Sequence, residues 1–300
     1  MEEAARTWKL LPLIETTARF FREKGLPSPR VDAELLMGHL LGKRRIDLYL
    51  EHDRHLTEQE VDRFREMVRD RASRRPVQRI VGATEFYGVT IAVPEGVFIP
   101  RPETELLVDR GVEFFRATGG GEGRTALDAG TGSGAIAVAL AKNVPGLRIV
   151  AVDRSPAALA AAAENARRNG LEDRWETVEG DGAAEVRVRA GALDLVVSNP
   201  PYVTSAEMEA LPPEVLEHDP APALHGGADG LDAYRALVPA AAAALLPGGA
   251  IVLEVSDSTA EGVLELARAE RRLEGASVTK DLAGHLRVFA ATARHDSVPG

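Results

Sequence analysis

The sequence contains no cysteine and no apolar run that reaches the roughly 18 residues needed to span a bilayer. Without cysteine, the chain has no disulfide, no thiolate zinc site and no cysteine nucleophile. The alanine-rich stretch 240–246 is too short to span a membrane and ends in Pro247-Gly248-Gly249. The first residues are acidic and polar and do not resemble a signal peptide. We therefore expect a cytoplasmic protein.

The sequence also has no excess of positive charge, and its histidines are not at metal-binding spacing. Residues 1–100 carry 17 Lys/Arg and 16 Asp/Glu, whereas the remainder carries 19 and 30, which gives a net charge of −10. Because phosphate neutralisation drives most duplex binding, the acidic remainder argues against a duplex DNA substrate. We expect no metal site, and we interpret these histidines as surface or helix-packing residues: His39, His52, His55, His218 and His225.

The length favours two domains, because roughly 150 residues per domain is typical. Residues 1–75 are predicted to be helical and to recognise the substrate protein. Ser28 with Pro29 predicts a helix start, and Thr57 with Glu60 predicts a capping box that opens a helix through about Ala72. Apolar spacing predicts that the first two helices bury Leu10, Leu13, Ile14, Thr17, Phe20 and Phe21, and Ala33, Leu35, Leu36, Leu40 and Leu41.

Residues 76–100 are predicted to form a β-hairpin linker, because Glu85–Val93 is rich in aromatic and β-branched residues around a glycine. Strand and helix patterns then alternate through residues 101–300. Such alternation predicts an α/β fold with a seven-stranded, mainly parallel sheet covered by helices on both faces and one antiparallel strand near the C-terminus. The predicted strands are Ala126–Ala129, Ile149–Asp153, Glu176–Glu179, Leu193–Ser198, Ala250–Val255, Ala276–Lys280 and Leu286–Ala291.

A glycine-rich loop follows the first of these strands. Gly130-Thr131-Gly132-Ser133-Gly134 lies between this strand and a helical run, where glycines allow tight turns and close approach of a ligand. Asp153, at the end of the next strand, can accept both hydroxyls of a ribose, although it can also cap the following helix. The spacing G-x-G-x-G differs from the dinucleotide pattern, so the two features together favour S-adenosyl-L-methionine over NAD.

Two more residues are candidates for the donor site. The third strand ends near Gly180-Asp181-Gly182, at the corner of such a sheet that faces an adenine. Asp181 can accept a hydrogen bond from the adenine amino group, and a simple turn aspartate is the alternative. Asp128 either orients the glycine loop through backbone N–H groups or contacts the donor indirectly.

The acceptor site is predicted at Asn199-Pro200-Pro201-Tyr202, which follows a buried-looking strand at its carboxyl end. Two prolines keep the chain extended, so the Asn199 side-chain oxygen and the Pro200 carbonyl can point the same way. Two such acceptors bind both N–H groups of a planar nitrogen and stabilise the positive charge that develops during methyl transfer. Tyr202 offers a flat face for the planar acceptor. The pattern predicts an amide or amino N-methyltransferase.

Over nearly its whole length the sequence resembles the HemK/PrmC family of release-factor glutamine methyltransferases. The resemblance rests on the helical N-terminus, the glycine loop, Asn199–Tyr202 and four further segments: Arg75–Gly82 with Glu85–Gly88, Ile99–Glu105, Asp219–Arg235, and Asp281–Gly284 with Arg287. The Asn-Pro-Pro-Tyr motif also occurs in adenine-N6 DNA and guanine-N2 RNA methyltransferases. Ile99–Glu105 and Asp219–Arg235 are more specific to this family.

The resemblance implies methylation at N5 of the glutamine in the Gly-Gly-Gln motif of class 1 peptide chain release factors, with S-adenosyl-L-homocysteine as the other product. It implies that Gly130–Gly134, Asp153, Gly182 and Asn199 contact the donor and that Asn199–Tyr202 contact the glutamine. The sequence departs from the family pattern at Ser256-Asp257-Ser258, where a glycine and then a glutamine are usual, and at Gly182, where a bulky aromatic is common.

Several alternatives remain open from the sequence. Arg101 and Glu103 either order the donor pocket or form an interdomain ion pair. A nucleic-acid amino-methyltransferase would use the same site, but the acidic catalytic half and the lack of a basic, aromatic target-recognition segment argue against it. A non-catalytic S-adenosylmethionine-binding module is disfavoured by the intact Asn199–Tyr202 motif, and an NAD-dependent dehydrogenase by the glycine spacing.

Overall fold

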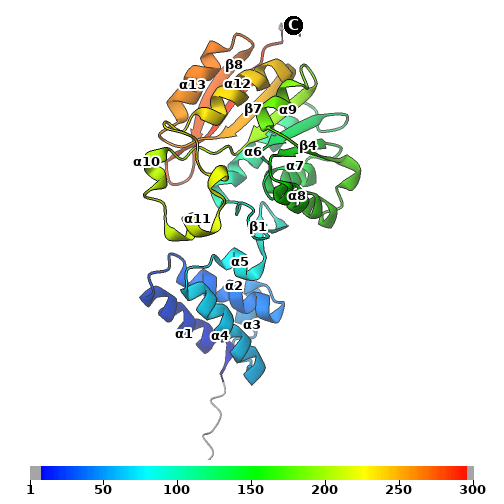
Figure 1. The fold of residues 1–300 in the computed structure, drawn as a ribbon. Coiled ribbons are helices and arrows are strands. Elements are labelled where there is room, and N and C mark those ends of the chain that lie inside the picture. The colour runs from blue at the N-terminus through cyan, green and yellow to red at the C-terminus, as the bar shows by residue number, and fades with distance from the viewer. Residues whose placement is uncertain (1–7, 296–300) are drawn as a thin grey trace, which may run out of the picture. The chain divides into compact units, whose positions relative to one another are not determined.

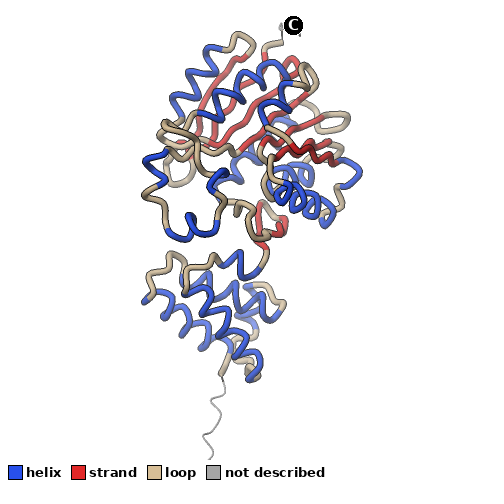
Figure 2. Tube along the Cα trace, viewed as in Figure 1, coloured by secondary structure: helices blue, strands red, loops and turns tan. Residues whose placement is uncertain are grey.

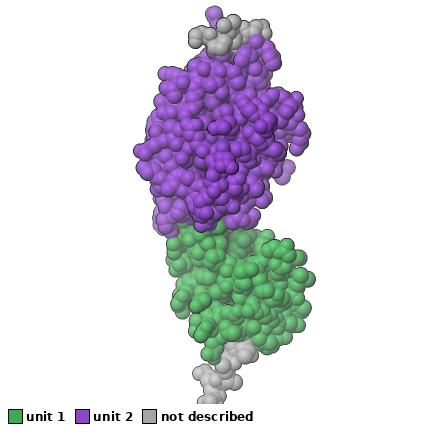
Figure 3. Space-filling model, turned by 90° about the vertical axis from the view of Figure 1, so that its right-hand side faces the viewer, with its two compact units in different colours: residues 1–83 green, residues 84–300 purple. Residues whose placement is uncertain are grey.

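A computed structural model of the chain describes residues 8–295. The chain divides into two compact units, residues 1–83 and residues 84–300, which Figure 3 colours separately. This division lies inside the range 76–100 that the sequence suggested as a linker. The domain ranges 1–75, 76–100 and 101–300 therefore remain predictions, and each unit is described by itself.

The first unit is helical in the residues described (Figure 1). Thr57 and Glu60 form the predicted capping box, in which Thr57 Oγ1 accepts from the Glu60 N–H and the Glu60 carboxylate accepts from the Thr57 N–H. Both bonds satisfy backbone donors that a helix start leaves free. The helices are α1 (Leu10–Glu23), α2 (Pro29–Leu41), α3 (Arg45–Leu50), α4 (Glu58–Ala72) and α5 (Val77–Val81).

The buried faces of α1 and α2 differ in detail from the predicted ones. On α1 the predicted positions are buried except Phe20, which is 37% exposed. On α2 the centre of the buried face is Ala33, Leu36 and the unpredicted Met37, whereas the other predicted leucines, Leu35, Leu40 and Leu41, are only half-buried. Ser28 precedes α2 as expected, but its side chain makes no capping hydrogen bond. The helical period was predicted correctly, and the differences are Phe20 on α1 and Leu35, Leu40, Leu41 and Met37 on α2.

The second unit contains the predicted sheet (Figure 2). Seven strands lie in the order β5-β4-β3-β6-β7-β9-β8, and β9 alone among them runs antiparallel to its neighbours. The predicted α/β fold is confirmed. Each predicted strand is extended or unchanged, except that the strand predicted as Ala250–Val255 begins five residues earlier and ends at Glu254. The strands are β3 (Thr125–Ala129), β4 (Arg148–Asp153), β5 (Trp175–Glu179), β6 (Leu193–Ser198), β7 (Leu245–Glu254), β8 (Leu273–Lys280) and β9 (Leu286–Ala293).

Alternate strand residues point to opposite sides of the sheet, and on both sides they are apolar. Helices cover both faces. Ala126, Ile149 and Leu195 pack in the core beneath the helices α6, α7 and α8 and the hairpin strands β1 and β2, whereas Leu127 and Val150 pack with α9, α12 and α13 on the other face. The elements are β1 (Ala83–Phe86), β2 (Val89–Ala92), α6 (Glu105–Ala117), α7 (Ala135–Asn143), α8 (Pro156–Arg168), α9 (Gly182–Arg187), α12 (Asp232–Ala244) and α13 (Ala260–Ala269).

The remaining elements lie in the loops that connect these layers. They are the short helices α10 (Ser205–Met208) and α11 (Pro213–His218) and the 3₁₀ turns η1 (Pro102–Thr104), η2 (Glu172–Arg174) and η3 (Ala221–Ala223). Because β3, β4, β6 and β7 are parallel, their carboxyl ends meet at one edge of the sheet, where ligands of open α/β sheets bind. Within residues 8–295, no helix is both long and apolar enough to cross a membrane.

Candidate active site

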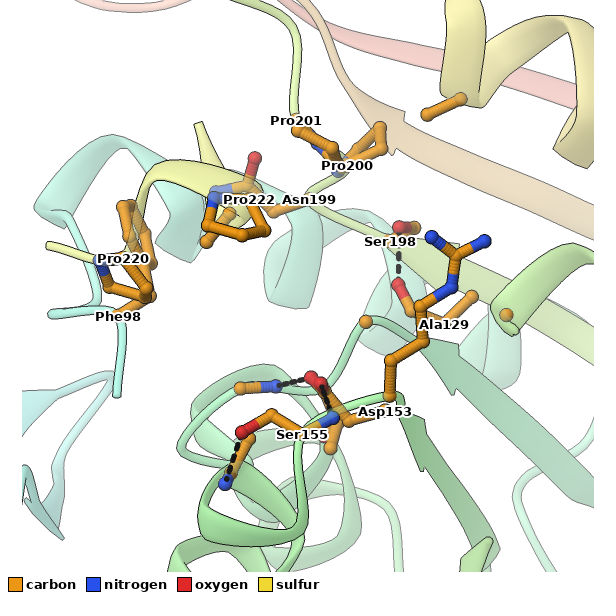
Figure 4. A pocket seen from close by; sticks show the side chains of 18 of the residues that line it. Phe98, Ala129, Asp153, Ser155, Ser198, Asn199, Pro200, Pro201, Pro220 and Pro222 are labelled. Carbon is orange, nitrogen blue, oxygen red and sulfur yellow. Dashed lines mark hydrogen bonds between the residues drawn. The ribbon is translucent and has the colours of Figure 1, made fainter. Parts of the chain in front are cut away.

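A cavity of about 1000 Å³ lies at this edge of the sheet. That volume is at the upper end of the range for small-molecule sites, roughly 300–1000 Å³. Figure 4 shows Asp153 on one side of the cavity and Asn199, Pro200 and Pro201 across from it. The cavity wall brings together most of the predicted site: Gly130, Thr131, Gly132, Ser133, Asp153, Asp181, Gly182, Asn199, Pro200 and Pro201. Gly134 and Tyr202 are predicted site residues that do not line it.

The glycine loop owes its shape to backbone geometry. Gly130, Gly132 and Gly134 have φ values of +76°, +55° and +78°, in the left-handed region that only glycine adopts readily. The N–H groups of Gly130 and Thr131 both donate to the Val152 carbonyl at 2.9 Å, which ties β3 to β4. A Cβ on Gly134 would lie 3.0 Å from Ala162, so this glycine allows the loop to pack against α8.

Asp153 lies on the cavity wall at the end of β4. Its Oδ2 accepts from the Gly132 N–H and its Oδ1 from the Ser155 N–H, both at 2.9 Å. The alternative that Asp153 caps the next helix is wrong, because Ser155 is the N-cap of α8 and accepts from the Ala158 N–H at 3.3 Å. The carboxylate is therefore held by backbone donors and retains lone pairs for a ligand on the cavity side.

Asp181 and Gly182 line the same wall at the start of α9. Asp181 Oδ1 accepts from the Ala184 N–H at 3.0 Å, and its Oδ2 pairs with the exposed guanidinium of Arg154. Asp181 is thus the cap of α9, while its predicted contact with an adenine remains a prediction. A Cβ on Gly182 would lie 3.0 Å from that of Ala129, so little space separates α9 from β3 at this point.

Asp128 lies in β3 beneath the glycine loop and is 1% exposed. Burial raises the pKa of its carboxyl to about 7, although the hydrogen bond from Thr131 opposes the shift and the negative charge of Asp153 adds to it. Its Oδ2 accepts from Thr131 Oγ1 at 2.8 Å. Its Oδ1 is buried without a hydrogen-bond partner of normal geometry among the residues described. Asp128 therefore contacts the loop through the Thr131 hydroxyl and not, as predicted, through backbone N–H groups of the loop.

These residues fit a donor that carries a ribose. The loop offers a glycine-lined concavity, and Asp153 offers acceptors for hydroxyl groups on the cavity wall. Within the described part of the chain, no group of three or more His, Asp or Glu residues could hold a metal ion.

The acceptor loop presents Asn199, Pro200 and Pro201 to the cavity. Asn199 Nδ2 donates to Thr104 Oγ1 at 3.2 Å, so the amide oxygen is the end turned away from Thr104. Tyr202 instead turns its hydroxyl to Glu254, to which it donates at 3.0 Å, and burial raises the pKa of this phenol well above its ordinary value. That Tyr202 packs on the acceptor therefore stays a prediction.

Thr104 and Glu254 were not identified as site residues from the sequence. Thr104 lies on the cavity wall, is 3% exposed and donates to Glu254 Oε2 at 2.6 Å. Burial raises the pKa of the Glu254 carboxyl, and the hydrogen bonds from Thr104 and Tyr202 oppose this shift. A glutamate at the carboxyl end of the otherwise apolar run Ala250–Val255 is the signal that could have indicated a buried functional carboxylate.

Two segments that the resemblance singled out are joined beside the cavity. The carboxylate of Asp219 is 1% exposed, pairs with the Arg101 guanidinium and accepts from the Ile99 N–H at 3.2 Å. The guanidinium carbon of Arg101 lies 5.1 Å from the ring centroid of Phe98, which lines the cavity. Arg101 and Asp219 belong to the same unit, so the suggested interdomain ion pair is wrong for Arg101.

The segment Ser256-Asp257-Ser258, which departs from the family pattern, contacts the start of β9. Asp257 Oδ1 accepts from the Leu286 N–H at 2.8 Å, and its Oδ2 lies 2.7 Å from His285 Nδ1. These contacts hold the pKa of Asp257 below its ordinary value, with the Leu286 N–H as the larger cause. The segment therefore attaches the start of β9 to the end of β7.

Comparison with known proteins gives consistent results along the chain. Residues 13–82 match the model of the PrmC N-terminal domain, and residues 90–218 match that of the methyltransferase small domain. A protein named release factor glutamine methyltransferase in Chlorobaculum tepidum is 42% identical over 85% of this chain and 88% of its own length. Proteins of the same name in Rhodopirellula baltica and Deinococcus radiodurans are 39% and 40% identical, covering 94% and 93% of this chain and 96% of each relative.

Among solved structures, the 16S rRNA N2 G1207 methyltransferase of T. Thermophilus, in complex with AdoMet and guanosine, resembles this chain with a TM-score of 0.52. The two share 24% sequence identity, and the match covers 71% of this chain and 50% of the other. This likeness concerns the fold alone. The three relatives, by contrast, are similar in sequence through both units and over nearly their whole length.

Proposed function

The chain belongs to the family of release factor glutamine methyltransferases, and on this premise we propose that it methylates N5 of the glutamine in the Gly-Gly-Gln motif of class 1 peptide chain release factors. S-adenosyl-L-methionine is the methyl donor and S-adenosyl-L-homocysteine the product. The observation that carries the proposal is the position of Asn199. Its carboxamide lines the same cavity as the glycine loop, on the wall across from it, with its nitrogen engaged by Thr104 and its oxygen turned away from that contact.

The acceptor loop orients the amide nitrogen of the substrate glutamine. The lone pair of an amide is delocalised, so the nitrogen is a poor nucleophile. Asn199 Oδ1 and the Pro200 carbonyl accept its two N–H groups, align it with the methyl group and stabilise the charge that develops. The bound donor supplies an electrophilic methyl group on a sulfonium. No strong base is required, because the amide proton leaves after the methyl group has been transferred.

The opposite wall holds the donor. Asp153 accepts the ribose hydroxyls, Gly130–Gly134 approach the donor closely, and Asp181 with Gly182 faces the adenine. Asn199 also contacts the donor, which places the methyl group beside the acceptor oxygen. The volume of about 1000 Å³ leaves room for a glutamine side chain next to the donor.

Mass spectrometry of a purified release factor incubated with the enzyme and isotope-labelled donor tests the proposal. We expect one methyl group on the glutamine of the Gly-Gly-Gln motif and none on a release factor in which this glutamine is alanine. Methylation of adenine or guanine in oligonucleotides, with no methylation of release factor, would instead support a nucleic-acid amino-methyltransferase. The net charge of −10 favours a protein substrate.

We further propose that the helical N-terminal domain recognises the body of the release factor in the cytoplasm, where translation termination takes place. Its charge is mixed, and it carries none of the residues assigned to chemistry. Deleting residues 1–83 should reduce methylation of whole release factor far more than donor binding. Equal losses of both, in a variant that unfolds at a lower temperature, would show that this unit only supports the fold.

A further inference from the structure

Glu254, the last residue of β7, has no part in the function proposed above, although it is 1% exposed and lies beside the acceptor loop. Its two carboxylate oxygens accept from two hydroxyls on different elements. Oε2 accepts from Thr104 Oγ1 at 2.6 Å, and Oε1 accepts from Tyr202 Oη at 3.0 Å. A buried carboxylate that accepts two such hydrogen bonds orients the hydroxyls of both Thr104 and Tyr202.

The direction of the proton on Thr104 follows from this arrangement. An ionised carboxylate can only accept, and a threonine hydroxyl has a single proton. Because that proton is donated to Glu254, Thr104 Oγ1 presents a lone pair to Asn199. A lone pair selects the amino end of the Asn199 carboxamide, in agreement with the 3.2 Å bond from Nδ2.

We propose that Glu254 is a positioning residue that determines, through the hydroxyl of Thr104, which end of the Asn199 carboxamide faces the acceptor. This inference rests on the proposed function, in which Asn199 Oδ1 accepts an N–H of the substrate glutamine. If Glu254 donated a proton to Thr104, the threonine proton would turn towards Asn199. The carboxamide would then reverse and present Nδ2 to the amide that it must bind, so two donors would face each other.

The groups around Glu254 influence the pKa of its carboxyl. Burial raises the pKa of the carboxyl, and the hydrogen bonds from Thr104 and Tyr202 and the positive charge of Arg287 oppose that effect. Glu103 adds a negative charge that raises it further. Arg287, on β9, is itself paired with Asp281 at 3.1 Å. Methyl transfer should therefore decline as falling pH protonates Glu254, while donor binding is unaffected.

Three substitutions separate positioning from structural support. Glu254→Gln keeps the volume but replaces one of the two acceptor oxygens with an NH2 donor, which then faces either Thr104 or Tyr202, and Thr104→Val keeps the shape but removes the hydroxyl. Both should lower the single-turnover rate on release factor by about 10²-fold, which is typical of a misplaced reacting group, while the donor Kd changes less than twofold. Thr104→Ser should recover most of the activity lost in Thr104→Val. Tyr234→Phe is the matched control, because Tyr234 donates at 2.7 Å to the backbone carbonyl of Glu254 and not to its carboxylate.

A double-mutant cycle gives the decisive kinetic result. Because Glu254 acts through Asn199, Glu254→Gln should have little further effect on an enzyme that already carries Asn199→Ala. The acidic limb of the pH–rate profile should also disappear in Glu254→Gln. Additive losses in the cycle, a wild-type rate in both Glu254→Gln and Thr104→Val, or an equal loss in Tyr234→Phe would overturn the proposal.

Selective ¹⁵N labelling of asparagine tests the orientation without any acceptor. In the wild type, the Asn199 amide protons should show nuclear Overhauser contacts with Thr104, and these should weaken in Glu254→Gln. Unchanged contacts in a variant whose rate has fallen would overturn the inference. If the wild type does not methylate release factor but the contacts behave as expected, the proposed function fails while the positioning role of Glu254 stands.

Discussion

The two walls of the cavity are built in different ways. On the donor wall, Gly130 and Gly132 take left-handed φ values, and the loop and the Asp153 carboxylate are held by backbone N–H groups. On the acceptor wall, the orientation of Asn199 depends on a chain of side chains, from its Nδ2 through Thr104 to Glu254. The shape of the donor wall therefore depends on the main chain. The orientation of Asn199 on the acceptor wall depends instead on side-chain hydroxyl and carboxylate groups.

This difference predicts how each wall responds to substitution. A site built from the backbone fails when glycines are replaced, because other residues resist its conformation. A site built from side chains fails when a single proton donor or acceptor changes, even if the volume is kept. The five predictions that follow test this contrast, from the largest expected effect to the smallest.

Asn199→Ala should produce the largest effect. It removes one of two oriented acceptors for the substrate amide, and losing such a preorganised contact costs about 10²–10³ in rate. Single-turnover methylation should fall by this factor, while calorimetric donor titration changes little because the glycine loop and Asp153 are untouched. Methylation at a near wild-type rate would remove Asn199 from the acceptor site.

Asn199→Asp is the sharper companion to this variant. The carboxylate keeps an acceptor oxygen but adds a negative charge near the positively charged end of the donor. Tighter binding of the ground state does not raise the rate. We expect a donor Kd equal to or lower than that of the wild type together with a strongly reduced rate.

Asp153→Asn should reduce donor affinity by roughly 10–100-fold, because hydrogen bonds to a charged acceptor contribute about 1.5–3 kcal/mol. The asparagine also turns an amino group towards one of the N–H groups of Gly132 and Ser155. The rate at saturating donor should change much less than the affinity, which isothermal titration and single-turnover kinetics can separate. A large loss of the saturated rate with unchanged affinity would contradict the assignment of Asp153 to the donor wall.

The contrast between the walls also explains what the sequence could reveal. The strands and the glycine loop are local patterns, and the predicted segments match β3 to β9 closely. The partners of Glu254 are not local, because Thr104 lies 150 residues before it and Tyr202 lies 52 residues before it. Hydrophobic periodicity does not predict contacts between residues so far apart in the chain. The sequence therefore identified Asn199 but not the residues that orient it.

Smaller errors have the same physical origin. Phe20 was placed in the core because helical spacing leaves neighbouring positions at the edge of a buried face nearly equivalent, whereas Met37 was missed although it is fully buried. Arg101 was considered as part of an interdomain pair because the sequence does not reveal that the distant Asp219 lies beside it. Tertiary packing decides each of these cases.

Gly134→Ala should destabilise the larger unit by about 2 kcal/mol. A left-handed φ costs a non-glycine residue roughly 1–2 kcal/mol, and the added Cβ would lie 3.0 Å from Ala162. Gly170→Ala is the matched control, because Gly170 has a φ of +67° and open space around its Cβ position. Thermal unfolding should show a larger loss for Gly134→Ala, and equal losses would mean that packing against α8 adds nothing.

The smallest expected effect is a change in the pH dependence of stability. Burial raises the pKa of Asp128 to about 7 in the folded chain, whereas an unfolded aspartate titrates near 4. Between these values the folded chain binds a proton that the unfolded chain has released. Stability therefore falls as pH rises through this window and levels off above it, by about 1 kcal/mol between pH 6 and pH 7.

Asp128→Asn has no proton to release, so it should remove this component of the pH dependence. In a unit of this size, about 1 kcal/mol corresponds to roughly 2–4 °C in Tm. The difference in Tm between pH 6 and pH 7 should thus be smaller in Asp128→Asn than in the wild type by that amount. Asp229→Asn is the control, because Asp229 is exposed and its pKa is lowered to about 2, outside this window. Because Asp128 also accepts from Thr131 under the glycine loop, an identical pH dependence in wild type and Asp128→Asn would mean that this carboxyl is already ionised in the folded chain, and that the donor wall carries a buried negative charge before any donor binds.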